Sequence, residues 1–149
     1  MPVIKEVKIK IESSIENLDQ SGLPDGEVEK TVSEAVGFIH CFGDEYLITY
    51  SERGEGGEVF SEILVKGDGV RVKRKGAIES DLYFEECTEH KSLYSIPPYK
   101  FDASVLTRRI RNGLNEDGGV LDLFYNMKIG GAEKSARMKI WISTASSHN

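Results

Sequence analysis

Alternation of apolar and polar residues with a period of two runs through almost the whole chain. The segment VKIKIE, residues 7–12, places three apolar side chains on one side of an extended strand and Lys8, Lys10 and Glu12 on the other. A period of two is the geometry of a β-strand with one buried face, and it does not suit a helix. The sequence therefore predicts an all-β protein. Further segments repeat the pattern: YLITYSE (46–52), EVFSEILVKG (58–67), AIESDLYFEE (77–86), KFDASVLTRRI (100–110), VLDLFYNMKI (120–129) and ARMKIWI (136–142).

Glycine-rich or polar turns separate these segments at nearly regular intervals, as in hairpin-connected strands. A meander of nine or ten antiparallel strands usually closes on itself, so we expect a single antiparallel β-barrel of about 8–10 strands with little helix. A β-sandwich is the alternative. The turns are at residues 42–45, 53–58, 67–69, 87–90, 97–99, 115–119 and 129–133.

The N-terminal third is harder to assign. Residues 28–42 read as extended, but their two faces are less separable, and a short helix near 29–36 is compatible with the sequence. The segment NLDQSGLPDGE, residues 17–27, is the longest irregular stretch. It is the best candidate for a loop or a lid.

Length and charge narrow the classes of function. A chain of 149 residues predicts one domain, here residues 3–144, followed by a frayed polar tail at 145–149. The net charge of −6 disfavours nucleic-acid binding, which depends on phosphate neutralisation. No apolar run approaches the length of a membrane span and no signal-peptide pattern opens the chain, so a cytoplasmic protein is expected.

No metal, cofactor or catalytic group can be assigned from the sequence. Cys41 and Cys87 are far apart and are expected to be free, buried thiols, and the three histidines show no ligand spacing. Ser61 and Ser80 sit among apolar neighbours, but no histidine is placed to act as a base for either. We therefore expect no enzymatic activity.

One residue breaks the alternation in a way that bears on function. In VRVKRKG, residues 70–76, the cations Arg71, Lys73 and Lys75 share one face of the strand. The other face carries Val70 and Val72 and then Arg74, where a third apolar residue would be expected. Arg74 is therefore predicted to start inside the barrel, near the end of its strand.

Three interpretations of Arg74 remain open. Glu52 follows Tyr50 on the inward face of another strand, so a bidentate Arg74–Glu52 ion pair could close one barrel end, with the hydroxyl of Tyr50 or Tyr94 completing its hydrogen bonds. Alternatively, Arg74 stays free at a barrel mouth and holds the carboxylate or phosphate of a ligand. In the third interpretation Arg74 simply reaches solvent.

Aromatic residues are the other candidates for contacts. Inward aromatics, Phe84, Tyr94 and Tyr125 among them, could stack on a ligand, although on an inner face they more often form core. Three outward residues could mark a homodimer patch if they cluster. These are Tyr83, Leu106 and Trp141.

The chain also resembles a known family, the YwiB-like bacterial proteins. The segments that carry the resemblance are VKIKIESSI, YLITYSE, VRVKRKGAIESDLYFEE, YSIPPYKFDASVLT and LDLFYNMKIGGAEKSARMKIWI. The resemblance covers about residues 3–142 and implies a calycin-like, lipocalin-type β-barrel, but it implies no activity.

From residues and resemblance together we expect a barrel that binds a small amphipathic or anionic ligand in its interior. Arg74, Glu52, Tyr50, Tyr94 and Phe84 are the tentative contacts. The alternative is a protein-interaction or assembly module with a filled barrel and no small-molecule ligand.

Overall fold

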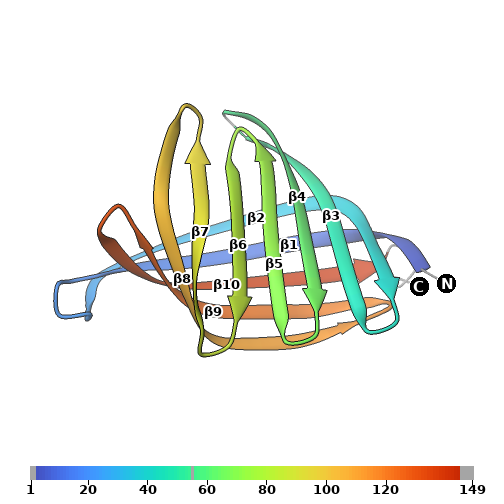
Figure 1. Ribbon diagram of the computed structural model, residues 1–149. Helices are drawn as coiled ribbons and strands as arrows, with labels where there is room; N and C mark the ends of the chain where they lie inside the picture. Colours follow the sequence, from blue (N-terminus) through green and yellow to red (C-terminus); the bar gives the residue numbers. More distant parts are fainter. Residues whose placement is uncertain (1–2, 55, 145–149) are drawn as a thin grey trace.

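The protein is a ten-stranded antiparallel β-barrel (Figure 1). The computed structural model describes residues 3–54 and 56–144, and this part of the chain contains no helix. No segment there could therefore span a membrane as a helix. The strands are β1 (Val3–Leu18), β2 (Pro24–Phe42), β3 (Glu45–Gly54), β4 (Gly57–Lys66), β5 (Gly69–Gly76), β6 (Glu79–Glu85), β7 (Glu89–Ile96), β8 (Tyr99–Asn115), β9 (Gly118–Ile129) and β10 (Ala132–Thr144).

Each strand pairs with its neighbours in sequence, and the first strand pairs with the last. The closing contact between β1 and β10 runs without interruption from Val7↔Thr144 to Asn17↔Lys134. The prediction of a closed barrel of about 8–10 strands is confirmed, and the sandwich is not found. The long strands β1, β2, β9 and β10 cross the shorter strands β3–β7 at a steep angle, which flattens the barrel (Figure 1).

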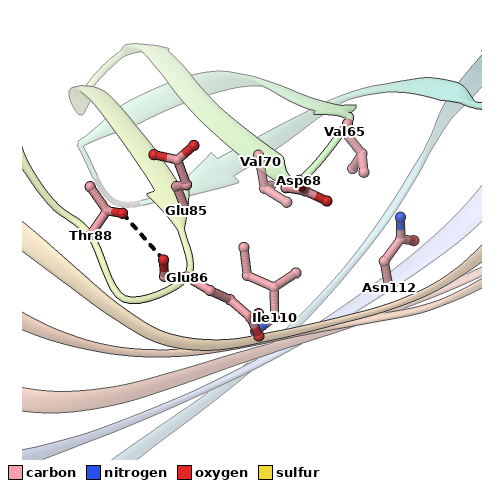
Figure 2. Close-up of a pocket in the computed structure, with 10 residues that line it drawn as sticks. Val65, Asp68, Val70, Glu85, Glu86, Thr88, Ile110 and Asn112 are labelled. Atoms are coloured by element: carbon pink, nitrogen blue, oxygen red, sulfur yellow. Dashed lines mark hydrogen bonds between the residues drawn. The ribbon is translucent and has the colours of Figure 1, made fainter.

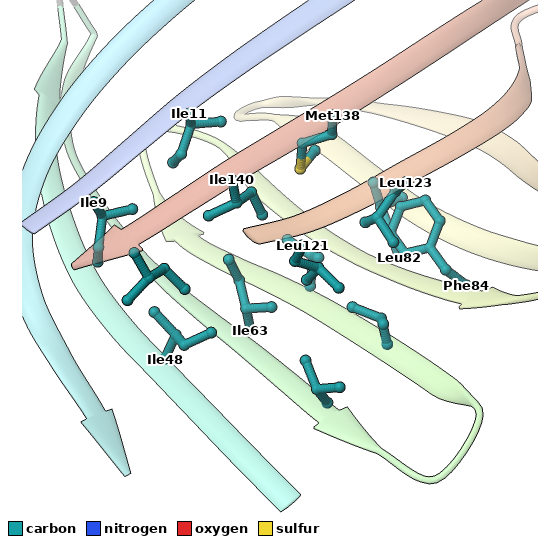
Figure 3. Close-up of a cluster of buried hydrophobic side chains, with 14 of the residues drawn as sticks. Ile9, Ile11, Ile48, Ile63, Leu82, Phe84, Leu121, Leu123, Met138 and Ile140 are labelled. Carbon is teal, nitrogen blue, oxygen red and sulfur yellow. The ribbon is translucent and has the colours of Figure 1, made fainter. Parts of the chain in front are cut away.

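The barrel interior is packed with apolar side chains at the end that includes the β4–β5 turn (Figure 3). Alternation places every second residue of each strand inward, and Ile48, Ile63 and Leu123 are fully buried. Facing positions carry mostly Ile, Leu and Val, which fill the space between the two walls. The interior between the β4–β5 turn and Arg74 is therefore a packed core.

In the N-terminal third the extended reading of residues 28–42 is confirmed, whereas the short helix and the long irregular segment are not found. Residues 29–36 are strand, not helix, because β2 pairs with β1 along almost its whole length, and strand–strand hydrogen bonds then satisfy its backbone. Residues 17–27 are not a lid. β1 continues to Leu18, β2 begins at Pro24, and a short turn at 19–23 joins them, stabilised by backbone hydrogen bonds to the Asp19 side chain.

The barrel wall is open between β2 and β3. These two strands pair only from Gly37↔Tyr50 to Phe42↔Glu45. Beyond Gly37 toward its N-terminus, β2 continues with β1 as its only neighbour. A side chain at position 37 would collide with the Thr49 carbonyl oxygen and the Tyr50 Cβ, so glycine allows the two backbones to approach where they last meet.

The sequence predicted two free and buried cysteines, and the structure agrees for Cys41 but places Cys87 at the surface. Both are free; Cys41 is buried, but Cys87 is exposed. Cys87 lies in the β6–β7 turn with a positive φ of 60°. A turn residue of this conformation projects away from the sheet, which explains its exposure. The predicted tail, residues 145–149, lies outside the described residues.

The packed end gives a direct test of the core. Replacing the fully buried Leu123 by Ala should lower the free energy of unfolding by about 2–5 kcal/mol, because it removes apolar contacts and leaves a cavity. The matched control is Leu93→Ala, since Leu93 is 56% exposed and should change stability by less than about 0.5 kcal/mol. Urea unfolding followed by circular dichroism measures both, and equal losses would contradict the assigned core.

Candidate functional site

A row of five polar side chains crosses the inner wall just beyond the core. In register across neighbouring strands the row is Tyr50 on β3, Ser61 on β4, Arg74 on β5, Ser80 on β6 and Tyr94 on β7. We call it the Tyr-Ser-Arg-Ser-Tyr row. Its order is symmetrical, with the cation in the centre, a hydroxyl on each side and a phenol at each end.

The row lies inward because it continues the apolar alternation of its strands. Ser61, Arg74 and Ser80 are each two residues from a buried core residue: Ile63, Val72 and Leu82, respectively. Ser61 and Ser80 are 0% and 5% exposed, whereas Arg74 is partly exposed. The prediction that Arg74 points into the barrel near the end of its strand agrees with this placement.

The two serine hydroxyls of this row have no well-formed hydrogen bond in the described part of the chain, although the Tyr50 hydroxyl lies within interaction range of Ser61 and Arg74. The Oγ atoms of Ser61 and Ser80 are buried, and neither makes a hydrogen bond of standard length and angle. The same part of the chain provides no ion pair within 4 Å for Arg74. A buried hydroxyl without a partner costs about 1–3 kcal/mol, so two of them beside one arginine form an uncompensated cluster of donors.

The charge of Arg74 reaches tyrosines on opposite walls. Burial raises the pKa of Tyr125, on β9, to about 12, and the nearby Arg74 cation partly offsets this effect. Burial likewise raises the pKa of Tyr50, and Arg74 is again the largest opposing cause. Both phenols are therefore protonated at neutral pH and are able to donate a hydrogen bond. Arg74 therefore lies near the phenols of Tyr50 on β3 and Tyr125 on β9.

A cleft of about 320 Å³ leads from the β2–β3 opening to Arg74. Its volume is at the lower end of the range for small-molecule sites. Hydroxyl and charged groups line one part of it and apolar side chains line the rest. The lining residues are Ile11, Ser13, Thr31, Ser33, Glu52, Arg53, Gly54, Val59, Arg74 and Ile78.

The structure does not contain the Arg74–Glu52 ion pair. Both residues line the cleft, but β4 lies between their strands, and Ser61 occupies the position beside Arg74. The two strands are separated by roughly 10 Å, Glu52 is two residues along the register from the position across from Arg74, and no nitrogen of Arg74 is within 4 Å of a Glu52 oxygen. Glu12, a further carboxylate at the end of an alternating segment, is on β1 and contributes to the electrostatic field at Arg137.

The aromatic candidates divide between core and mouth. Phe84 is fully buried and meets the Tyr125 ring edge-on at a centroid distance of 4.9 Å, so it packs the floor below the row. Tyr94 and Phe101 lie 6.5 Å apart on neighbouring strands, and Phe101 is 39% exposed. Tyr94 is therefore positioned at the rim, whereas Phe84 is not.

Sequence reasoning considered Ser61 and Ser80 only as nucleophiles and missed their place beside Arg74. The signal was available in the turn between β4 and β5. A two-residue turn at 67–68 pairs Lys66 with Gly69, and counting outward pairs Ser61 with Arg74. The position of Ser80 depends on the less regular β5–β6 turn.

A second cavity, of about 610 Å³, lies at the opposite end of the barrel between the β4–β5 and β6–β7 turns (Figure 2). Its carboxylates are Asp68, Glu85 and Glu86, and the Glu86 carboxylate accepts a hydrogen bond from the Ile110 backbone N–H at 2.8 Å. In the described residues no three acidic, His or Cys side chains are arranged to hold a metal ion. This acidic end is unsuited to an anion.

The geometry defines a class: a closed antiparallel barrel of calycin-like type with a packed apolar core and, at the end away from the β4–β5 turn, a cleft that reaches Arg74. The family model described as "Domain of unknown function (DUF1934)" matches residues 9–142, and the chain belongs to that family. The resemblance noted in the sequence is confirmed at this level.

One solved structure shows the same fold. The chain is similar to the crystal structure of the ywiB protein from Bacillus subtilis, with a TM-score of 0.83 and 21% sequence identity. The match covers 96% of this chain and 94% of the other. No curated protein matches the sequence. At this identity the likeness establishes the fold alone.

The two buried hydroxyls without a well-formed hydrogen bond give a prediction about the stability of the ligand-free protein. Ser61→Ala and Ser80→Ala should each leave the free energy of unfolding of the ligand-free protein unchanged or raise it by up to about 1 kcal/mol, because each removes an unpaired buried polar group. Ser95→Ala is the matched control. Ser95 is equally buried, but its Oγ donates to the Tyr99 carbonyl at 2.9 Å.

Loss of that hydrogen bond should cost about 0.5–1.5 kcal/mol in the control. Thermal and urea unfolding of the three variants provide the comparison. A loss of more than about 1 kcal/mol in Ser61→Ala or Ser80→Ala would mean that these hydroxyls have structural partners.

Proposed function

We propose that this protein binds a small amphipathic anion at the open end of its barrel, with Arg74 as the anchor. One observation carries the proposal: Arg74, which lines the cleft, stands between two buried hydroxyls, Ser61 and Ser80, that make no well-formed hydrogen bond, with the Tyr50 hydroxyl close to Ser61 and Arg74. An oxyanion entering the cleft would accept hydrogen bonds from Arg74 and from both serines. Charge-assisted hydrogen bonds of this kind are the strong ones in proteins.

The charge balance favours a monoanion, and we propose a carboxylate. The row contains one cation, and its other members are neutral hydroxyls. Glu52 and Arg53 line the same cleft, and their opposite charges offset one another. A dianionic phosphate would bring a second charge into a partly buried site that has no second cation in the row to compensate it.

The apolar lining of the cleft supports an amphipathic ligand. Ile11, Val59 and Ile78 line it together with Arg74, so an apolar tail has a wall to cover while the carboxylate contacts the row. The solid core beyond Phe84 limits the depth that a ligand can reach. We infer a small ligand held at the mouth, not one enclosed along the barrel axis.

The alternative, a protein-interaction module, is favoured by a different observation: exposed apolar side chains gather on the outer face of β2. The two functions use opposite faces of the sheet and are compatible. The cytoplasmic location expected from the sequence stays a prediction.

Native mass spectrometry of the gently purified protein tests the proposal first. The wild-type chain should carry a small-molecule mass that is absent from Arg74→Met. In titrations, octanoate should bind the wild type more tightly than octanol, which lacks the charge, and more tightly than octyl phosphate at a pH where it is a dianion. Arg74→Met should weaken octanoate binding about 10- to 100-fold, the range for a hydrogen bond to a charged group.

Lys75→Met is the control for a lost positive charge. Lys75 is the next residue of β5, exposed on the outer face. The Lys75→Met variant should bind octanoate as tightly as the wild type. Equal weakening by Lys75→Met, or no difference between octanoate and octanol, would contradict an anchor at Arg74.

A further inference from the structure

The outer face of β2 carries an exposed stripe of valines. Val28, Val32 and Val36 are 49%, 57% and 61% exposed, and Phe38 continues the stripe at 46%. Residues 24–36 of β2 have no strand neighbour other than β1, so this face is accessible. Exposed apolar side chains in a row typically mark an interaction surface.

The predicted dimer patch is not one surface. Trp141, Tyr83 and Leu106 are on β10, β6 and β8, and another strand separates each from the next. The Trp141 ring instead lies between two lysines, Lys10 and Lys139, whose Nζ atoms are 5.1 and 4.9 Å from its centroid. A search for an interface therefore leads to β2.

The stripe is self-complementary in charge about its central residue. Lys30 and Glu34 stand two residues to either side of Val32, and both point outward. Reversing the strand about Val32 exchanges Val28 with Val36 and Lys30 with Glu34. A second copy in antiparallel orientation would thus present a carboxylate to every ammonium group and a valine to every valine.

The neighbouring strand extends the same symmetry. In the β1–β2 register Glu16 lies beside Val28, and Lys8 lies beside Val36. The same reversal therefore brings Glu16 opposite Lys8 of the second copy. Glu12, beside Val32, would meet its own counterpart on the axis, but it already lies in the field of Arg137.

We propose that two copies of this chain associate through the outer faces of their β1–β2 ribbons, about a two-fold axis at Val32. The contact is isologous, as most homodimer contacts are. This inference is independent of the proposed ligand site.

Charge selects this register among the alternatives. An axis at residue 30 would place Lys30 against Lys30, and an axis at residue 34 would place Glu34 against Glu34. Like charges directly opposite one another are destabilising, and opposite-charge pairs stabilise. The axis at Val32 keeps all three valines in contact and pairs Lys30 with Glu34 twice, and the like-charge approach that it creates is that of Glu12 on β1, which lies in the field of Arg137.

Charge reversal on the full chain tests the interface. Sedimentation velocity over a range of concentrations should show the wild type approaching twice the 16.6 kDa chain mass. Lys30→Glu creates two Glu–Glu contacts across the axis and Glu34→Lys creates two Lys–Lys contacts. Each variant should therefore associate about tenfold or more weakly than the wild type, while Lys91→Glu, on β7, should not differ.

A mixture of the Lys30→Glu and Glu34→Lys variants is the decisive experiment. In a mixed pair, residues 30 and 34 of one copy are glutamates and those of the other are lysines, so both contacts become attractive. A one-to-one mixture should recover dimers that neither variant forms alone, which misfolded variants could not do. A wild type that is monomeric throughout, or a mixture that stays monomeric, would overturn the proposal.

Discussion

Closure of the sheet by β1 and β10 is the contact on which the rest of the structure depends. The uninterrupted pairing from Val7 to Asn17 gives both strands a partner and fixes which side of every strand is inside. Because closure fixes the inner side of every strand, every second residue of each strand must help to fill the same barrel interior. The chain does this with isoleucine, leucine and valine at one end only.

The polar row begins where that filling stops. Arg74 is tolerated there because the β2–β3 opening admits solvent to its guanidinium group, so its charge is not fully desolvated. Ser61 and Ser80 have no such access. Two buried hydroxyls without acceptors lower stability, and folding alone gives no reason for them. A site kept ready for an acceptor from outside the chain gives one.

The inward direction of Arg74 and the number of strands could be predicted from the sequence, because both follow from alternation and turns. The absence of an Arg74–Glu52 pair could not be predicted from the alternation of inward and outward residues along each strand. This alternation places both side chains inside the barrel. Whether they make contact depends on which strands are adjacent, and β4 separates β3 from β5. The start of β2 at Pro24 and the exclusion of a helix at 29–36 could not be settled from the sequence for a similar reason. The N-terminal half of β2 is strand because β1 pairs with it, and local sequence carries little of that information.

The β1–β2 ribbon connects the two proposed surfaces without mixing them. Thr31 and Ser33 point into the cleft, whereas Lys30, Val32 and Glu34 point outward, because successive residues of a strand alternate between its faces. Between Pro24 and Val36 this strand is held on one side only. A strand held on one side is the part of the barrel wall that is freest to move, so a second copy packed on its outer face would also fix one wall of the cleft. Association would then order the mouth of the barrel before a ligand arrives, and this would reduce the entropy cost of binding.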